Sequence, residues 1–327
     1  MKMYFVFFLI FILFSGCLIE SSLEEEEEKI KVVTSFYPLY EFTSNVGGDK
    51  INVEMLIPPN VEPHEYELKP SDMIKILESD LFIYNGAGME PWVHNIIEHN
   101  EINVLDASKG IKLLESECNH EHETHHHHEE KNETHEHEEE EEHGHEHGEY
   151  DPHIWLSPLN AIIQVENIRD KLIELDENNE EYYTENANEY IMKLSELDEK
   201  IKSEINPEKC KKRDVVITHA TLGYFCEEYN CNQIALSGIT PEAEMSIKQI
   251  TEIMHEIEGK NVTVIFFEEQ VNPKTAKIIA DELGIETMIF NTIHGITEED
   301  RNTGKNYITL MEENISKLKY ALECGFD

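Results

Sequence analysis

The chain has 327 residues, enough for two domains with full cores, and its 69 acidic against 26 basic residues give a net charge of −43. A protein this acidic has no basic surface that would release counterions from phosphates, which argues against a nucleic-acid partner. Its negative field attracts cations and favours a cation ligand, although the same acidity also serves solubility.

The N-terminus predicts export. Residues 3–14 are almost wholly apolar behind Lys2, and the run is too short to span a bilayer as a stable helix. It ends at Ser15-Gly16-Cys17, which resembles a lipoprotein processing site. We therefore expect residues 1–17 to be a signal peptide, Cys17 to carry a lipid anchor in the membrane, and residues 18–29 to form an acidic tether. A simple secretory signal and an uncleaved anchor are the alternatives, and all three place the body outside the cytoplasm.

Residues 30–177 alternate short β-rich runs with amphipathic segments. This alternation predicts βαβ units with a mostly parallel sheet, and hence an N-terminal α/β lobe. The expected strands are 31–35, 52–56, 81–84 and 103–105, and the expected helices are 38–45, 71–78 and 91–98.

A tract rich in histidine and glutamate interrupts this lobe at residues 119–149. Its composition predicts a disordered segment. Clustered imidazoles bind borderline cations, so we expect an accessory, low-affinity metal collector, with a solvated loop of incidental affinity as the alternative. The tract holds 11 of the chain's 18 histidines: His120, His122, His125, His126, His127, His128, His135, His137, His143, His145 and His147.

Two helices are expected next, at 158–175 and 178–206. The second carries one apolar stripe at steps of three and four residues, and its length suits a link between two lobes. Residues 207–327 then predict a second α/β lobe, with strands at 215–218, 233–235, 262–267 and 286–289 and helices at 246–258, 273–283 and 303–322. The predicted fold class is α/β, with two lobes joined by one long rigid helix.

Five cysteines remain besides Cys17, and an exported protein can form disulfides. Cys226 and Cys231 are closest in sequence and are the expected pair, with burial as small apolar side chains as the alternative. The dispersed spacing does not match a zinc finger. The five are Cys118, Cys210, Cys226, Cys231 and Cys324.

Three histidines follow expected strands or the tract, and ligands of open α/β sheets bind at the carboxyl ends of strands. They are His64, His153 and His219, and prolines before the first two stiffen their loops. Three imidazoles suit zinc better than manganese or calcium, with protein or water in the fourth place.

The sequences around these histidines resemble one family, the metal-binding solute-binding proteins of zinc and manganese ABC transporters. The resemblance extends over residues 32–322, and a His-rich insertion before the second motif is typical of its zinc-specific branch. It implies one metal site in the cleft between two α/β lobes. The motifs are VEPHEYE (61–67), DPHIWLSP (151–158), THA (218–220) with GYF (223–225), and FEEQVNP (267–273).

Carried over by position, the resemblance makes His64, His153 and His219 the metal ligands. Manganese-binding relatives usually have a carboxylate at the third position, so His219 favours zinc.

The fourth ligand is where the chain departs from the family. Many relatives have an aspartate near Asn291, but an Asn carbonyl is a poor zinc ligand, so Asn291 is expected to be a turn residue. Water or a weak contact is expected instead, with His294 and Glu268 as alternatives. His294 is otherwise expected in a surface loop, and Glu268 is otherwise expected to orient an imidazole from outside the ligand shell.

The resemblance also concerns Cys324. Some zinc relatives join a cysteine before the glutamate strand to one near the C-terminus, and Cys324 matches the second. Residues 262–267 contain no cysteine, so that bridge is expected to be absent.

The sequence thus predicts a monomeric, membrane-anchored zinc receptor that delivers Zn²⁺ to an ABC transporter permease and is not an enzyme. A manganese or iron receptor is the alternative within the family. A three-His zinc hydrolase with Glu268 as general base, and an adhesin that uses zinc structurally, are the alternatives from other classes.

Overall fold

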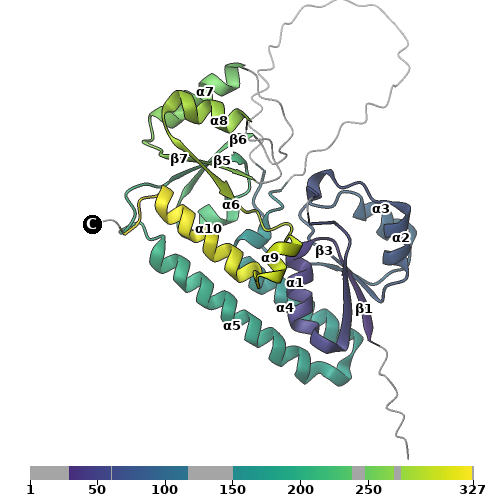
Figure 1. Ribbon diagram of the computed structural model, residues 1–327. Helices are drawn as coiled ribbons and strands as arrows, with labels where there is room; N and C mark the ends of the chain where they lie inside the picture. The colour runs from purple at the N-terminus through teal and green to yellow at the C-terminus, as the bar shows by residue number, and fades with distance from the viewer. Residues whose placement is uncertain (1–28, 60, 117–149, 238–246, 269–273, 326–327) are drawn as a thin grey trace, which may run out of the picture.

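A computed structural model describes residues 29–59, 61–116, 150–237, 247–268 and 274–325 (Figure 1). The expected signal peptide with Cys17, the eleven tract histidines, Cys118 and most of the motif at 267–273 lie outside these residues. Among the described helices, none combines the length and apolar character needed to cross a membrane.

The N-terminal lobe is built on a parallel sheet with the strand order β2-β1-β3-β4. All four strands lie where the sequence predicts them, within a residue or two. The strands are β1 (Ile30–Thr34), β2 (Ile51–Met55), β3 (Leu81–Tyr84) and β4 (Val104–Asp106). The helices are α1 (Tyr37–Gly47), α2 (Pro70–Leu77) and α3 (Val93–His99).

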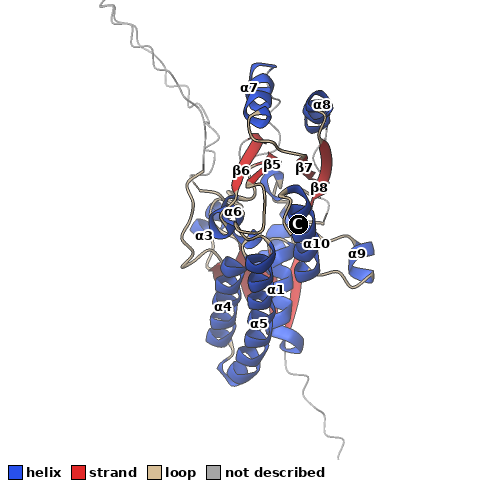
Figure 2. Cartoon of the chain, turned by 90° about the vertical axis from the view of Figure 1, so that its left-hand side faces the viewer, coloured by secondary structure: helices blue, strands red, loops and turns tan. Residues whose placement is uncertain are grey.

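The C-terminal lobe repeats this order in a second parallel sheet, β6-β5-β7-β8. Figure 2 shows α7 and α8 on one face of the sheet and α6 and α10 on the other. The strands are β5 (Asp214–His219), β6 (Asn232–Ser237), β7 (Val264–Glu268) and β8 (Glu286–Phe290). The helices are α6 (Gly223–Tyr229), which the sequence analysis missed, α7 (Ile247–Glu258) and α8 (Lys274–Leu283).

Three long helices connect the lobes. Helices α4 (Pro158–Leu175) and α5 (Glu180–Glu204) pack on each other, and α10 (Tyr307–Ala321) packs on α5 on its way back (Figure 1). The 25 residues of α5 span roughly 38 Å at 1.5 Å per residue, which fits the expected link between two lobes. The expected helix at 303–322 begins later, because the Asn306 side chain caps α10, and a short α9 (Glu298–Asn302) precedes it.

Four short 3₁₀ helices among the described residues were also not expected from the sequence. One of them, η2, lies in the loop that follows β2, and another, η3, lies in the loop that precedes α4. They are η1 (Gly48–Lys50), η2 (Pro63–Glu65), η3 (Ile154–Leu156) and η4 (Glu177–Asn179).

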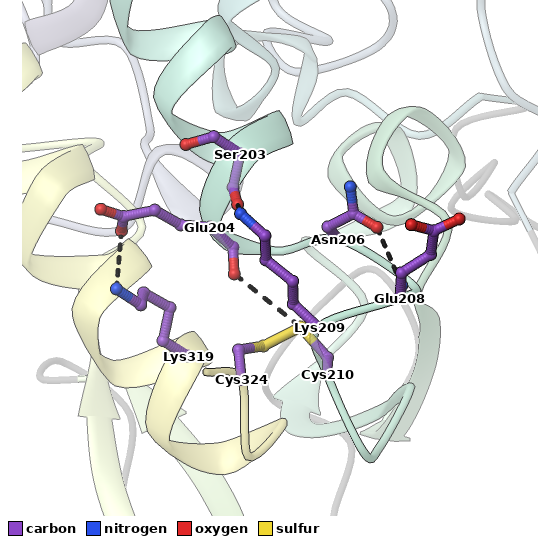
Figure 3. Close-up of a disulfide and its surroundings, with 8 residues drawn as sticks. All are labelled: Ser203, Glu204, Asn206, Glu208, Lys209, Cys210, Lys319 and Cys324. Carbon is purple, nitrogen blue, oxygen red and sulfur yellow. Dashed lines mark hydrogen bonds and ion pairs between the residues drawn. A yellow bond between two sulfur atoms is a disulfide. The ribbon is translucent and has the colours of Figure 1, made fainter. Parts of the chain in front are cut away.

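One disulfide joins Cys210, just before β5, to Cys324, just after α10 (Figure 3). The expected pair was wrong: Cys226 and Cys231 are free, buried thiols. Burial raises the pKa of the Cys226 thiol well above its usual value, which keeps it protonated and unreactive. Sequence spacing misled because the true partners are 114 residues apart and meet only when the chain end returns to the second sheet.

Candidate metal centre

Three histidine side chains from separate parts of the chain meet between the lobes. His64 lies in η2 after strand β2, His153 directly precedes η3, and His219 is the last residue of β5. Their Nδ1 or Nε2 atoms all lie within 4.8 Å of one another. The structure therefore brings together the three histidines that the sequence singled out.

The spacing of the imidazole nitrogens suits a small tetrahedral cation. His153 Nε2 is 3.1 Å from His64 Nε2 and 3.4 Å from His219 Nε2. Zinc–nitrogen bonds of about 2.0–2.1 Å place two tetrahedral ligands about 3.3–3.4 Å apart. One ion can thus contact all three nitrogens with small adjustments of the side chains.

Strand order explains why His219 faces this point. The chain places β6 on one side of β5 and then crosses over to place β7 on the other side. The order in which strands are added therefore changes direction between β5 and β7. In open α/β sheets a crevice forms outside the carboxyl ends of strands at such a switch point. His219 ends β5 and Glu268 ends β7, so both occupy this crevice.

Two buried carboxylates orient two of the imidazoles. Asp151 Oδ1 lies 2.8 Å from His153 Nδ1 and also accepts the His153 backbone N–H at 2.9 Å. Glu268 Oε1 contacts His219 Nδ1 and accepts a hydrogen bond from the Thr218 hydroxyl at 3.3 Å. A carboxylate on Nδ1 fixes the ring and leaves Nε2 with the lone pair for a metal. Glu268 thus lies where the sequence analysis expected an orienting carboxylate.

The loop that carries His153 is clamped by the C-terminal lobe. Tyr224 donates its hydroxyl to the Asp151 carbonyl at 2.7 Å, and Tyr307 donates its hydroxyl to the Trp155 carbonyl at 2.6 Å. The Trp155 indole N–H donates to the Thr292 carbonyl at 2.8 Å. These bonds hold the loop against the C-terminal lobe, so His153 is positioned by more than its own motif.

Glu62 and His294 also lie at this cleft. His294 is buried, not in a surface loop as the sequence suggested, and only 5% of it is exposed. Its Nδ1 is 2.6 Å from the Thr292 hydroxyl, and its Nε2 is 3.8 Å from Glu62 Oε2. Glu62 was missed as a site residue, although it stands two positions before His64 in the first motif.

Burial dominates the protonation of these groups. It lowers the pKa of His64 well below the usual value, and the neighbouring His153 and His219 lower it further. Burial also lowers the pKa of His294 to about 4, against an opposing effect of Glu268. It raises the pKa of Glu62 to about 7, with repulsion from Glu268 acting in the same direction. His64 and His294 are therefore held as neutral imidazoles, which are the form that binds metals.

Asn291 lies in the loop after β8, where its side chain and backbone are both hydrogen-bonded. Its side-chain oxygen accepts the Ile293 backbone N–H at 2.8 Å. Its own backbone N–H and carbonyl bond the Asn314 side chain of α10 at 3.1 and 2.6 Å. The hydrogen bonds of Asn291 thus serve the loop after β8.

Comparison with known proteins places the chain among zinc-uptake proteins. The family described as zinc-uptake complex component A, periplasmic (ZnuA), matches residues 32–321. The high-affinity zinc uptake system protein ZnuA of Bacillus subtilis is 37% identical over 306 residues, which are 93% of this chain and 91% of that protein.

The zinc-binding lipoprotein AdcA of Streptococcus pneumoniae is 36% identical over 307 residues, but the chain spans only 57% of its length. The crystal structure of the Zn(II)-bound ZnuA-like domain of AdcA is 33% identical and covers 90% of this chain and 99% of that domain, with a TM-score of 0.72. The laminin-binding protein Lmb of Streptococcus agalactiae, described as an adhesin with metal transporting activity, is 28% identical. It covers 90% of this chain and 99% of Lmb, with a TM-score of 0.75.

Proposed function

The chain belongs to the family of periplasmic zinc-uptake components A, and from that premise we propose that it is an extracytoplasmic zinc receptor for an ABC-type importer. It binds Zn²⁺ in the cleft between its lobes and delivers the ion to a permease. Zinc is the cargo of the protein and takes part in no reaction.

The observation that carries this proposal is the convergence of three imidazole nitrogens from both lobes within 4.8 Å. The proposed ligands are His64, His153 and His219. Each is buried or half-buried, so an ion bound there is shielded from competing ligands in solution.

The donor set favours zinc over manganese. The group holds three imidazoles, and the two nearest carboxylates, those of Asp151 and Glu268, contact Nδ1 atoms on the far side of the rings. Manganese prefers carboxylate-rich sites, whereas imidazole suits zinc. We propose water for the fourth place, because the group of mutually close His, Cys, Asp and Glu ligand atoms among the described residues includes neither His294 nor Glu268.

The membrane anchor and the role of the His-rich tract are proposed from the sequence. We propose that Cys17 is lipidated and anchors a monomer on the outer side of the membrane, with residues 18–29 as a tether. The histidines of residues 119–149 then act as a weak, multi-ion collector that raises the zinc concentration near the cleft.

Metal titration with elemental analysis tests the proposal on the whole chain and on a variant lacking residues 119–148. The whole chain should bind one zinc ion tightly and several weakly, and the deletion should keep only the tight ion. Tight retention of manganese or iron in place of zinc would contradict the proposal. Loss of the tight ion in the deletion would show that the tract supplies a ligand.

A three-His zinc hydrolase is the alternative from another class. It needs a free general base, but the proposed candidate, Glu268, is fully buried and contacts His219 and the Thr218 hydroxyl. We therefore favour a receptor. Hydrolytic turnover that disappears in His153→Ala would reverse this choice.

A further inference from the structure

The loop that carries His153 is also held from the N-terminal lobe, by Asn85. This residue directly follows β3 and is fully buried. Its side-chain nitrogen Nδ2 donates one hydrogen bond to the Pro152 carbonyl at 2.9 Å and another to the Gly86 carbonyl at 3.1 Å. Asn85 thus bonds the residue directly before a proposed zinc ligand.

The bonded carbonyl belongs to the peptide group that leads into His153. A peptide group is planar, so its oxygen and its N–H move together. Asn85 holds the oxygen of this group, and Asp151 Oδ1 accepts its N–H at 2.9 Å. The Ile154 backbone N–H also donates to the oxygen at 2.8 Å, but it belongs to the same loop and does not tie the peptide to the lobe. Holding both ends of the group sets the direction in which the imidazole leaves the backbone.

The amide of Asn85 is itself held in one orientation. Its Oδ1 accepts a hydrogen bond from Gln164 Nε2 of α4 at 3.2 Å. A rotated amide would set Oδ1 against the Pro152 and Gly86 carbonyl oxygens and Nδ2 against the Gln164 N–H. The Asn85 backbone N–H also donates to the buried Glu90 carboxyl at 2.8 Å, which fixes the main chain at this point. Both the main chain and the side chain of Asn85 are therefore fixed.

The position requires the chemistry of an asparagine. The side chain has to donate two hydrogen bonds and accept one, and a short amide does both. Aspartate has the same shape, but an ionised carboxylate donates no hydrogen bond. Leucine has a similar volume, but it neither donates nor accepts, so the Pro152 and Gly86 carbonyls would lose these partners.

From these bonds we infer that Asn85 is a positioning residue for zinc binding, which acts through the Pro152 carbonyl to hold His153 at its distance from His64. This inference rests on the proposed function. His64 lies in the loop after β2, and its Nε2 is 3.1 Å from His153 Nε2. Asn85 therefore couples the two imidazoles through one lobe. Without its bond, the His153 loop depends more on its bonds to the C-terminal lobe, and the distance to His64 is less well fixed.

The zinc affinity of Asn85→Leu, measured on the whole chain by competition with a chelator, tests the inference. We expect a loss of about 10-fold, the lower end of what removing an orienting partner of a metal ligand costs. One molar equivalent of Co²⁺, which fills the tight site first, should give an altered visible spectrum, because the absorption bands of cobalt report the geometry of its ligands. Asn85→Ala leaves room for a water molecule at the carbonyls and should lose affinity in the same direction, which keeps the test available if the leucine variant does not fold.

The matched control is Asn167 of α4. Its Nδ2 also donates to two carbonyls, those of Ala107 and Lys109 in the loop after β4, at 3.2 and 2.8 Å. Asn167→Leu should lower the stability against denaturant but keep the zinc affinity and the cobalt spectrum of the wild type.

Three results would overturn the inference: wild-type zinc affinity in Asn85→Leu, a lower affinity with the wild-type cobalt spectrum, or an equal loss of affinity in Asn167→Leu. A wild-type chain that holds no zinc tightly would instead refute the proposed function, and this inference with it.

Discussion

The two lobes share one strand order but differ in how their sheets are buried. The N-terminal sheet belongs to a single large hydrophobic core that continues through α4, α5 and α10. In the C-terminal sheet, successive side chains along a strand face two different hydrophobic cores. Val215 and Ile217 of β5 face this large core, whereas Val216 and its neighbour Ile265 on β7 face a small, separate core under α7 and α8.

This difference indicates which parts of the molecule depend on each other. The inner face of the C-terminal sheet shares its core with the N-terminal lobe, so the two lobes support each other there. The outer layer of α7 and α8 rests on the small core alone. His219, at the end of β5, is thus fixed by the shared core, and the outer layer has little part in holding the cleft.

The largest expected effect comes from removing one proposed ligand from each lobe. His153→Ala and His219→Ala should each weaken zinc binding by roughly 100- to 1,000-fold or more. Structural zinc sites bind with about 10–16 kcal/mol, so one ligand of three or four carries on the order of 3–5 kcal/mol. Competition with a chelator of high affinity measures only the tight site.

The exposed His255→Ala, in α7, is the matched control and should bind zinc as the wild type does. If only one of the two ligand variants loses affinity, the metal is not shared between the lobes and the three-His site is wrong.

A second comparison uses isoleucines on opposite faces of neighbouring strands. Ile217→Ala and Ile265→Ala both empty fully buried positions, and each should cost about 2–5 kcal/mol. Ile217→Ala should raise hydrogen exchange in both lobes, because its core is shared. Ile265→Ala should raise it mainly in α7 and α8. If both substitutions raise hydrogen exchange over the same parts of the protein, the small core is not an independent unit.

Removing the charge of a carboxylate that orients an imidazole should have a smaller effect on zinc affinity. Each lobe supplies one such carboxylate. Asp151→Asn and Glu268→Gln should each lower zinc affinity about 10- to 100-fold, because an orienting partner of a metal-bound histidine is worth about that much. Chelator competition gives the values. A variant that leaves affinity unchanged would mean that its histidine is oriented by packing alone.

The smallest expected effect is a dependence of stability on pH that arises in the N-terminal lobe. Glu90 is buried beneath the carboxyl ends of β1 and β3. Its carboxyl accepts hydrogen bonds from the Ser35 hydroxyl at 2.6 Å and from the backbone N–H groups of Asn85 and Gly86 at 2.8 and 3.2 Å. Burial nevertheless raises its pKa to about 7 from the ordinary 4.5.

The folded protein therefore binds a proton at Glu90 that the unfolded chain releases between about pH 4.5 and 7. The contribution of Glu90 to the free energy of unfolding should fall as pH rises through this window, by at most about 1.4 kcal/mol per pH unit. Denaturant melts at several pH values should show a flatter profile for Glu90→Gln than for wild type. Parallel profiles would assign the slope to other groups.

Much of the architecture could be predicted from the sequence, because period-two and helical patterns mark both lobes and proline-flanked motifs mark His64 and His153. Other features depend on contacts between distant segments that no local pattern records. Glu62 and His294 belong to loops of different lobes, and Cys210 meets Cys324 only through the path of α10. Helix α6 was missed because its seven residues are too few for a clear period.

Helix α10 bears on how the protein is made. Its Tyr307 holds the His153 loop, its Asn314 holds the loop after β8, and the segment behind it supplies Cys324 to the disulfide. A chain still emerging from the ribosome lacks all three contacts. The cleft can therefore reach its final form only after α10 and the residues behind it have been made and have packed, so the last part of the chain completes a site whose ligands come from earlier parts.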